Sequence, residues 1–412
     1  MLIEFSVENF LSFKERVTLS MDTSSGTKLP QNIIKTPKMR LLKSAAIYGA
    51  NSSGKSNLIK AISFMHGMVT TSHNFNINTE IKVTPFKLNT KCSNSPSHFE
   101  IKFIHENITY KYGFSCDSKR IVDEYLFYAK GKKEKKIFER INTENFSFGI
   151  DEEQQESIKS QVIENTLYLS RSTQLKYLKT RDPYLFISNL VININPSWVN
   201  YTIRKLHEDP ELKTKILEIM KKADFGGIES IKIKKESKPI QKVNFNVNQK
   251  NESSIQIGNS IDDFFEVEFT HKDENGKNVN FDIKEESDGT NKTLAMLGPL
   301  FDIMENGKVA FIDEFDSSLH PKITRLLIML FHSDKNKKNG QIIFTTHDTT
   351  LLDNELFRID QIYFCSKEPN KNTKLSSLLD YDIRQVTDFE RAYLNGRVGG
   401  VPFIDETLLS EE

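Results

Sequence analysis

The sequence predicts an α/β fold in which a mostly parallel sheet carries helices on both faces, with an antiparallel β lobe and a short helical insertion. Three observations lead to this prediction. From residue 286 onward, helix-compatible and strand-compatible segments alternate, which is typical of a parallel sheet. Residues 80–150 show the apolar–polar alternation of antiparallel strands. Residues 152–224 show helical periodicity instead.

Residues 1–150 are expected to form an N-terminal lobe that begins with strands. Ile3, Phe5 and Val7 share one face of the first strand because side chains alternate along a strand. The apolar run over residues 45–48 then precedes a glycine-rich loop and a helix over 56–68. In the β-rich part the alternating residues are Phe99, Ile101, Phe103, Tyr110, Tyr112 and Phe114, with turns at Asn107 and over 130–136.

Residues 151–227 are expected to form the helical insertion. Its clearest helix begins with Asp209 as the N-cap and Pro210 at the first helical position, and it ends at Gly226-Gly227. The apolar face of this helix consists of Leu212, Ile216, Met220 and Ala223. Sustained a/d heptads are missing from the insertion, so we expect no long coiled-coil arm.

Residues 228–412 are expected to form the C-terminal lobe. Strands return at 228–285, with a hairpin at Asn275-Gly276. The alternating part that follows predicts helices over 290–305 and 321–332 and strands over 309–312, 341–345 and 361–364.

Composition excludes several classes of protein. Lys plus Arg and Asp plus Glu each number 56 in 412 residues, so the net charge gives no argument for a nucleic-acid-binding protein. No run of about 18 apolar residues predicts a membrane helix, and residues 1–10 do not read as a secretion signal. The three cysteines are far apart and form no CxxC pair, which argues against a disulfide framework and a cysteine-based zinc site. We therefore expect a soluble cytoplasmic protein.

The strongest motif is residues 49–56, GANSSGKS, a complete GxxxxGKS pattern between a predicted strand and a predicted helix. Such a loop points successive main-chain N–H groups, and the positive end of the helix dipole, at phosphate oxygens. Lys55 can reach the same oxygens, and Ser56 can ligate Mg²⁺. The alternative is a chance loop of Gly and Ser. The residues that we expect to bind the phosphates are Gly49, Asn51, Ser53, Gly54, Lys55 and Ser56.

Two predicted strands end in side chains suited to phosphate chemistry. The strand over 309–312 is followed by Asp313 and Glu314; we expect Asp313 to hold Mg²⁺ and Glu314 to act as a general base on water. The strand over 341–345 delivers His347 to the same sheet edge, where it could sense the γ-phosphate and orient the water. Taken alone, Asp313 and Glu314 could equally be solvated caps of the strand. Taken alone, His347 is more often simply a hydrogen-bonded histidine at a strand end.

A further anion site is expected at Ser287 and Gly289, because they lie at the N-terminus of the helix over 290–305. The alternative for Ser287 is a simple N-cap.

Together these motifs resemble the ABC-type ATPase heads of the SMC, RecF and OLD group. The resemblance makes 49–56 the Walker A loop, 309–314 the Walker B strand, SDGT at 287–290 the signature and His347 the switch histidine. It also implies a D-loop at Ser317-Ser318-Leu319. Residues 8–13, ENFLSF, resemble the N-terminal NFxSF turn of that group, which implies cofactor contacts by Asn9 and Phe13.

Residues 393–402, YLNGRVGGVP, resemble the tail of a narrower set, bacterial AAA-family ATPases similar to the RloA and AbiL subunits. This resemblance implies ATP and Mg²⁺ as cofactors and an ATP-dependent homodimer in which the Walker A loop of one copy faces the signature of the other. It also implies a switch role in phage defence or abortive infection, beside an effector protein encoded nearby. The sequence departs from the group in three places. SDGT is not an LSGGQ-like signature, Leu11 stands where many SMC-like heads have a basic residue, and residues 85–87, in the region of the glutamine loop, contain no Gln.

Two other functions stay open. A RecF-like DNA repair ATPase could contact DNA phosphates through the basic segments 232–235 and 335–338. A transporter's nucleotide-binding subunit is disfavoured by the NFxSF opening and by the tail, and we expect no membrane partner.

Overall fold

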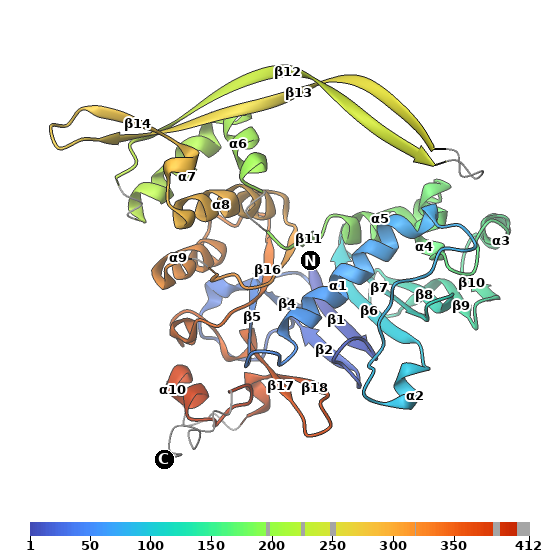
Figure 1. The fold of residues 1–412 in the computed structure, drawn as a ribbon. Helices are drawn as coiled ribbons and strands as arrows, with labels where there is room; N and C mark the ends of the chain where they lie inside the picture. The colour runs from blue at the N-terminus through green and yellow to red at the C-terminus, as the bar shows by residue number, and fades with distance from the viewer. Residues whose placement is uncertain (195–197, 224–226, 248–252, 318, 382–387, 402–412) are drawn as a thin grey trace, which may run out of the picture. The chain divides into compact units, whose positions relative to one another are not determined.

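The computed structural model describes the chain except for residues 195–197, 224–226, 248–252, 318, 382–387 and 402–412 (Figure 1). Gly226, Ser318 and Pro402, which belong to predicted features, therefore lie outside the described residues. The chain forms two compact units. The first comprises residues 1–193, 303–317 and 321–412, and the second comprises residues 194–302 and 318–320. The boundaries that we expected at 150 and 227 are not the boundaries of these units.

The strands that end at the predicted site residues belong to a six-stranded sheet of the first unit. Its strand order is β11-β15-β16-β5-β17-β18, and every neighbouring pair is parallel except β17 with β18. The central strands are mostly apolar and fully buried, as expected for strands covered on both faces. The expected mostly parallel sheet is confirmed. The strands are β5 (Ser44–Tyr48), β11 (Val191–Ile192), β15 (Val309–Ile312), β16 (Gln341–Thr345), β17 (Ile362–Lys367) and β18 (Thr373–Ser377).

A seven-stranded antiparallel sheet forms the rest of the β structure of this unit, together with the short pair β3 (Ile33–Lys35) and β4 (Arg40–Leu42). The expected antiparallel lobe is confirmed. The larger sheet has the order β10-β9-β8-β7-β6-β1-β2. Its strands are β1 (Leu2–Glu8), β2 (Val17–Ser20), β6 (Ser97–His105), β7 (Ile108–Cys116), β8 (Ile121–Ala129), β9 (Lys135–Ile141) and β10 (Asn145–Phe148).

One detail of the first strand was predicted wrongly. The pairing of β1 with β6 shifts register between Leu2 and Glu4, so the side-chain alternation is interrupted there. Leu2 therefore joins Phe5 and Val7 in the main core, whereas Ile3 packs in a separate small cluster.

Helix α1 (Lys55–Thr71) lies in the core that the two sheets share. Its buried apolar residues, Ile62 among them, belong to one apolar cluster with Phe99 of the antiparallel sheet and Ile343 of the parallel sheet. The other helices of this unit are α2 (Thr90–Ser93), α3 (Glu152–Lys159), α4 (Tyr168–Gln174), α5 (Leu178–Ser188), α9 (Pro321–His332) and α10 (Phe389–Leu394). The 3-10 turns η5 (Thr349–Leu351) and η6 (Ile359–Gln361) also belong to it.

The second unit combines helices with a long three-stranded ribbon. Asp209 caps α7 as expected, because its side chain accepts hydrogen bonds from the N–H groups of Glu211 and Leu212. The expected hairpin joins β13 to β14, with Gly276 at φ +76°. The elements are α6 (Val199–Glu208), α7 (Pro210–Lys222), β12 (Ser230–Val247), β13 (Ser253–Lys272), β14 (Asn278–Asp282) and the part of α8 (Asp288–Asn306) up to residue 302. Within the described part of the chain, no helix is long and apolar enough to cross a membrane.

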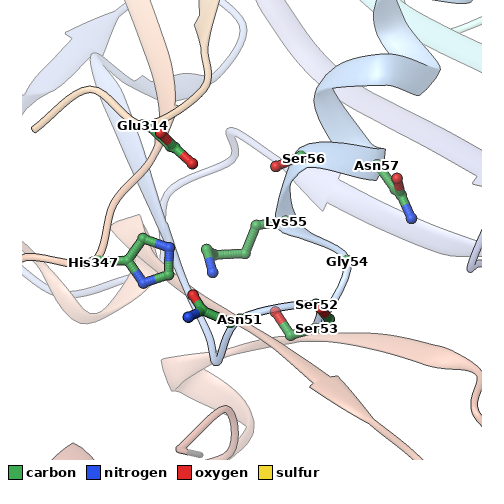
Figure 2. A pocket seen from close by; sticks show the side chains of 9 residues that line it. All are labelled: Asn51, Ser52, Ser53, Gly54, Lys55, Ser56, Asn57, Glu314 and His347. Atoms are coloured by element: carbon green, nitrogen blue, oxygen red, sulfur yellow. The ribbon is translucent and has the colours of Figure 1, made fainter. Parts of the chain in front are cut away.

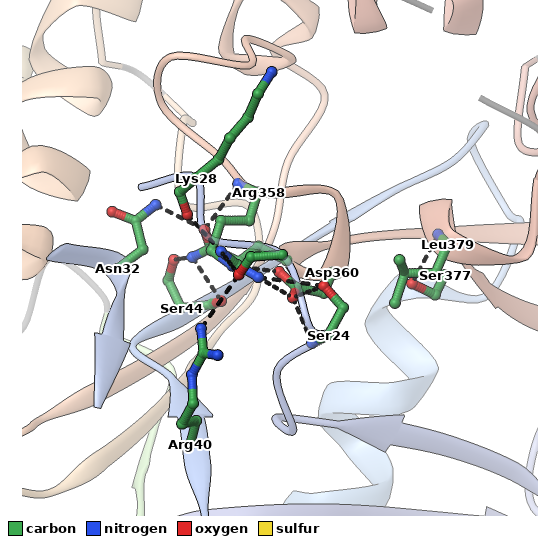
Figure 3. A network of polar contacts seen from close by, with 11 residues as sticks. Ser24, Lys28, Asn32, Arg40, Ser44, Arg358, Asp360, Ser377 and Leu379 are labelled. Atoms are coloured by element: carbon green, nitrogen blue, oxygen red, sulfur yellow. Dashed lines mark hydrogen bonds and ion pairs between the residues drawn. The ribbon is translucent and has the colours of Figure 1, made fainter. Parts of the chain in front are cut away.

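A buried ion pair stabilises the segment that leads into β17 in the first unit. Arg358 donates two hydrogen bonds to the Asp360 carboxylate, at 2.9 and 2.7 Å, and the two side chains are 3% and 1% exposed. Asp360 also accepts from the N–H and hydroxyl groups of Ser24, and Arg358 donates to the carbonyl oxygens of Gly26 and Lys28 (Figure 3). The network therefore ties the loop after β2 to the strand beside β5.

Candidate functional site

The GxxxxGKS loop runs from β5 into α1, as its sequence predicts. Gly49 has φ +152° and Gly54 has φ +113°, values that residues with a side chain rarely adopt. A Cβ on Gly49 would collide with the Cys365 carbonyl oxygen, and a Cβ on Gly54 would collide with the Thr373 hydroxyl. Both glycines are therefore required by the shape of the loop.

The loop opens into a pocket of about 340 Å³ that also receives the ends of two strands (Figure 2). Figure 2 shows Glu314 and His347 across from the loop, with the Lys55 side chain reaching toward them. Gly49 and Asp313 are not among the lining residues. The residues that line the pocket are Asn51, Ser52, Ser53, Gly54, Lys55, Ser56, Asn57, Glu314 and His347.

Lys55 is held at the base of the loop. Its Nζ donates to the carbonyl oxygens of Gly49, at 2.7 Å, and of Ala50, at 3.1 Å. Burial lowers the pKa of the Lys55 ammonium group, and nearby acidic groups, including Asp313 and Glu314, partly offset that shift. Lys55 and the two acids of the β15 strand end thus lie close enough to interact.

The Ser53 hydroxyl gives a direct test of whether the loop fits a phosphate. Ser53 is 3% exposed and lines the pocket, yet its Oγ has no hydrogen-bond partner within the described part of the chain. A buried hydroxyl without a partner is costly. The N-terminus of α1 adds main-chain N–H groups that have no acceptor within the helix. These donors, together with Lys55, match the acceptor oxygens of a nucleotide phosphate.

The two acids after β15 are positioned by Thr345, the last residue of β16. The Thr345 hydroxyl donates to Asp313 Oδ1 at 2.6 Å and accepts from the Glu314 N–H at 2.8 Å. The Asp313 N–H in turn donates to Asn193 Oδ1 at 3.0 Å. Glu314 has φ +50°, so the chain turns there, as expected at the end of the strand. This turn is what brings the Glu314 side chain to the pocket.

His347 is exposed and lines the pocket at the end of β16. The main-chain N–H of His347 donates to Asp316 Oδ2 at 3.2 Å, so the loop after β15 also supports the histidine loop. The structure thus brings Lys55, Glu314 and His347 together, as the spacing of the motifs predicted.

The oxygen donors available here suit Mg²⁺. Ser56 lies at the start of α1, and Asp313 presents a carboxylate whose Oδ1 is already oriented by Thr345. Mg²⁺ commonly takes only one or two protein oxygens and fills its shell with phosphate and water. The described residues contain no cluster of three or more His, Cys, Asp or Glu side chains that could hold a metal alone. The residues therefore fit a Mg²⁺ ion that arrives with a nucleotide, and they do not form a stand-alone metal cage.

Asn9 and Phe13, expected to contact a cofactor, have their side chains in the interior. The Asn9 side-chain amide donates to the carbonyl oxygens of Cys92, Ser95 and Pro96 and accepts from the Phe86 N–H. Phe13 is fully buried in the main core. Cofactor contact by either residue stays a prediction, and neither lines the pocket.

Replacing Asn9 with alanine is therefore expected to destabilise the fold while leaving nucleotide affinity nearly unchanged. The change leaves several buried main-chain groups unpaired and puts alanine at φ +50°, which together cost about 2–4 kcal/mol. Urea denaturation measures the loss, and calorimetric titration with ATP measures the affinity. A folded variant with greatly reduced ATP affinity would instead show that Asn9 contacts the cofactor.

The same N-terminal turn does support the phosphate loop through Ser12. The Asn57 side-chain amide donates to Ser12 Oγ at 2.8 Å. The Thr373 hydroxyl lies 2.8 Å from Ser12 Oγ and 2.8 Å from the Ser53 carbonyl oxygen. Ser12 and Thr373 thus brace the loop from outside the pocket.

The predicted signature lies in the second unit, so its residues are described separately from the pocket. The Ser287 hydroxyl accepts from the Thr290 N–H at 3.1 Å, which makes Ser287 the N-cap of α8. Ser287 is exposed and Gly289 half-buried in the first turn. The N-cap role is thus present in the structure, and an additional role as an anion site stays a prediction.

Sequence reasoning missed three supporting residues. Thr345 could have been found, because it stands inside the strand motif that ends at His347. Asn193 and Thr373 carry no motif, and only the pairing of β11 with β15 and the position of β18 bring them to the site.

Solved structures with similar folds include heads of SMC proteins. The SMC head bound to the C-terminal winged-helix domain of ScpA has 14% sequence identity and a TM-score of 0.46, over 91% of this chain and 97% of that one. The SMC head domain of Thermotoga maritima has 13% identity and a TM-score of 0.41, over 91% and 98%. The SMC head of Pyrococcus yayanosii with a coiled coil and joint has 11% identity and a TM-score of 0.44, over 96% and 99%.

No curated protein matches the chain at a significant level. A family profile does match residues 44–353, from the first residue of β5 to beyond His347. The match spans the phosphate loop, the acids after β15 and the histidine after β16, and it covers most of the chain. The resemblance to AAA-family ATPases that the motifs indicated is thereby confirmed. The chain belongs to the P-loop ATPase family described as "AAA domain, putative AbiEii toxin, Type IV TA system".

Proposed function

We propose that this protein binds and hydrolyses ATP with Mg²⁺, dimerises when ATP is bound, and acts as the switch subunit of an abortive-infection type of phage defence that uses a separate effector protein. The observation that carries the proposal is the pocket in which the phosphate loop, Glu314 and His347 meet. The buried Ser53 hydroxyl without a partner supports a phosphate ligand in that pocket.

The residues at and beside the pocket have distinct parts in the proposed reaction. Lys55 and the main-chain N–H groups of the loop bind the phosphates, and Ser56 with Asp313 holds Mg²⁺, which neutralises phosphate charge when bound. Glu314 accepts a proton from the attacking water. His347 orients that water and senses the last phosphate. The main-chain hydrogen bond from His347 to Asp316 holds its loop in place for this role.

Dimerisation is proposed because the chain carries both halves of a composite site. The phosphate loop lies in the first unit, and Ser287 and Gly289 lie at the start of α8 in the second. The exposed Ser287 is available to another copy. Two copies that exchange these surfaces would each complete the pocket of the other, so ATP binding would favour the dimer and hydrolysis would open it.

The defence role is supported by the family description, which names a putative AbiEii toxin and a type IV toxin–antitoxin system. The ion pairs made by the basic segment 232–235 argue against DNA as the main ligand. Lys235 pairs with Asp263 at 2.9 Å and Lys234 with Glu268 at 3.9 Å, so this basic segment already has acidic partners. DNA phosphates would have to compete with those carboxylates.

A Glu314→Gln variant is expected to bind ATP but to accumulate as a dimer. Glutamine keeps the size of the side chain and cannot accept the proton, so hydrolysis falls by at least about 100-fold and the ATP-bound state persists. Sedimentation velocity with and without ATP and Mg²⁺ measures the association. The exposed Glu156→Gln change in α3 is the matched control and is expected to behave as the wild type. A Glu314→Gln protein that stays monomeric with saturating ATP would refute dimerisation.

A further inference from the structure

The segment Phe389–Gly400 packs against the strand that leads into the phosphate loop, although it follows that loop by more than 300 residues in the sequence. It consists of α10 and the turn after it (Figure 1). Tyr393 is 6% exposed, stacks on Phe364 with ring centroids 5.5 Å apart, and lies 6.0 Å from the ring of Tyr48. Tyr48 is the last residue of β5 and directly precedes Gly49.

Gly400 approaches the first glycine of the loop. A Cβ on Gly400 would lie 3.1 Å from Gly49 Cα and 3.2 Å from the Cys365 carbonyl oxygen, closer than most such contacts. Gly400 has φ +92°, so an L side chain there is also strained. Its carbonyl oxygen accepts a hydrogen bond from the Tyr393 hydroxyl at 3.1 Å, which closes the turn onto α10.

The same segment also reaches the histidine loop. Glu390 of α10 accepts a hydrogen bond from the Thr349 hydroxyl at 2.7 Å. Thr349 begins η5, two residues after His347. One short segment therefore contacts both loops that form the pocket: Gly400 approaches Gly49 of the phosphate loop, and Glu390 binds Thr349 in the loop after His347.

We infer that residues 389–400, here named the tail clamp, position the phosphate loop and the His347 loop relative to each other for ATP hydrolysis. Gly400 fixes Gly49 by close main-chain packing, and Glu390 fixes the loop after His347 through Thr349. Neither residue touches the nucleotide, so both are positioning residues. The inference rests on the proposed ATPase function and adds to it a part of the chain outside the Walker motifs.

The two contacts predict different kinetic effects. Gly400→Ala pushes on Gly49 and is expected to raise the ATP dissociation constant about tenfold, the scale of an overpacked contact. Glu390→Ala frees the His347 loop and is expected to lower kcat about tenfold while the ATP dissociation constant stays within about twofold. Glu390→Gln keeps an acceptor oxygen for Thr349 and is expected to restore most of kcat.

Full-length proteins are compared by calorimetric titration with ATP and by steady-state ATPase assays. Gly131→Ala is the matched control, because Gly131 lies in the turn between β8 and β9 and a Cβ there meets nothing within 4 Å. Tyr393→Phe removes only the hydroxyl that binds Gly400. If Gly400→Ala does not fold, this variant tests instead whether the position of Gly400 affects ATP binding. It is expected to weaken ATP binding about threefold.

The outcomes separate the tail clamp from the ATPase proposal itself. A wild-type protein that neither binds nor hydrolyses ATP overturns the proposed function. If the wild type is active, two results together would overturn the tail clamp. Gly400→Ala, or Tyr393→Phe if Gly400→Ala does not fold, would bind ATP as tightly as Gly131→Ala does, and Glu390→Ala would keep the wild-type kcat. A split between affinity and kcat, with rescue by Glu390→Gln, supports it.

Discussion

Replacing Lys55 with alanine is expected to lower ATP affinity by at least about 100-fold, the largest effect of any single change at the pocket. Lys55 is the pocket cation closest to the loop carbonyls, since its Nζ donates to Gly49 and Ala50. Its ammonium is already partly desolvated by burial, which lowers its pKa, so exchanging the carbonyl oxygens for charged phosphate oxygens costs little further desolvation and gains strong charge-assisted hydrogen bonds.

The change also removes a support of the phosphate loop itself. Without Lys55 the carbonyl groups of Gly49 and Ala50 lose their hydrogen bonds, so the loop itself is expected to loosen. Calorimetric titration with ATP measures the affinity. Lys60→Ala removes an exposed charge from the same helix and serves as the control, with affinity unchanged. Tight ATP binding by folded Lys55→Ala protein would remove the assignment of residues 49–56 as the phosphate loop.

The parts of the pocket that could be predicted from the sequence are local in the chain. The phosphate loop occupies eight consecutive positions, and its glycines, lysine and serine identify it without any partner. Asp313, Glu314 and His347 could be placed beside it because strands of a parallel sheet end at a common edge. In the structure Glu314 and His347 line the pocket with the loop, whereas Asp313 does not.

The parts that could not be predicted depend on contacts between distant positions. Asn193 reaches the Asp313 N–H across 120 positions, and Thr373 reaches the Ser53 carbonyl oxygen across 320. The approach of Gly400 to Gly49 is of the same kind. Such contacts follow from strand order and from the path of loops, which short-range periodicity does not encode. The register shift at Leu2 was missed for a related reason, because alternation alone assumes an uninterrupted strand.

The boundary of the second unit shows the same limit. Composition separated the helical part, 151–227, from the strands after it, yet helices α3 to α5 belong to the first unit and the ribbon β12–β13 belongs with α6 and α7. Local propensity predicted the main helices and strands, but it missed the short strand β11 within the helical part. Which elements share a core is decided by tertiary packing.

Asp360→Ala is expected to have the largest effect on stability, a loss of about 3–5 kcal/mol in the free energy of unfolding. The reason is the charge that remains. Without the carboxylate, Arg358 keeps a buried guanidinium group with only neutral partners, the carbonyl oxygens of Gly26 and Lys28 and the Ser24 hydroxyl. Ser24 also loses the acceptor of both its N–H and its hydroxyl.

The loss is expected to spread toward the pocket because η6, which contains Asp360, adjoins β5. Gln361, the next residue, donates to the main-chain and side-chain oxygens of Ser44, the first residue of β5. Urea denaturation followed by circular dichroism measures the loss, and hydrogen exchange of the β5 and β17 amides localises it. Glu156→Ala breaks an exposed ion pair with Lys159 and is the control, with a change within about 0.5 kcal/mol. If Asp360→Ala proved as stable as Glu156→Ala, the buried ion pair would contribute no net free energy of unfolding. The position of β17 would then be stabilised by the apolar core alone.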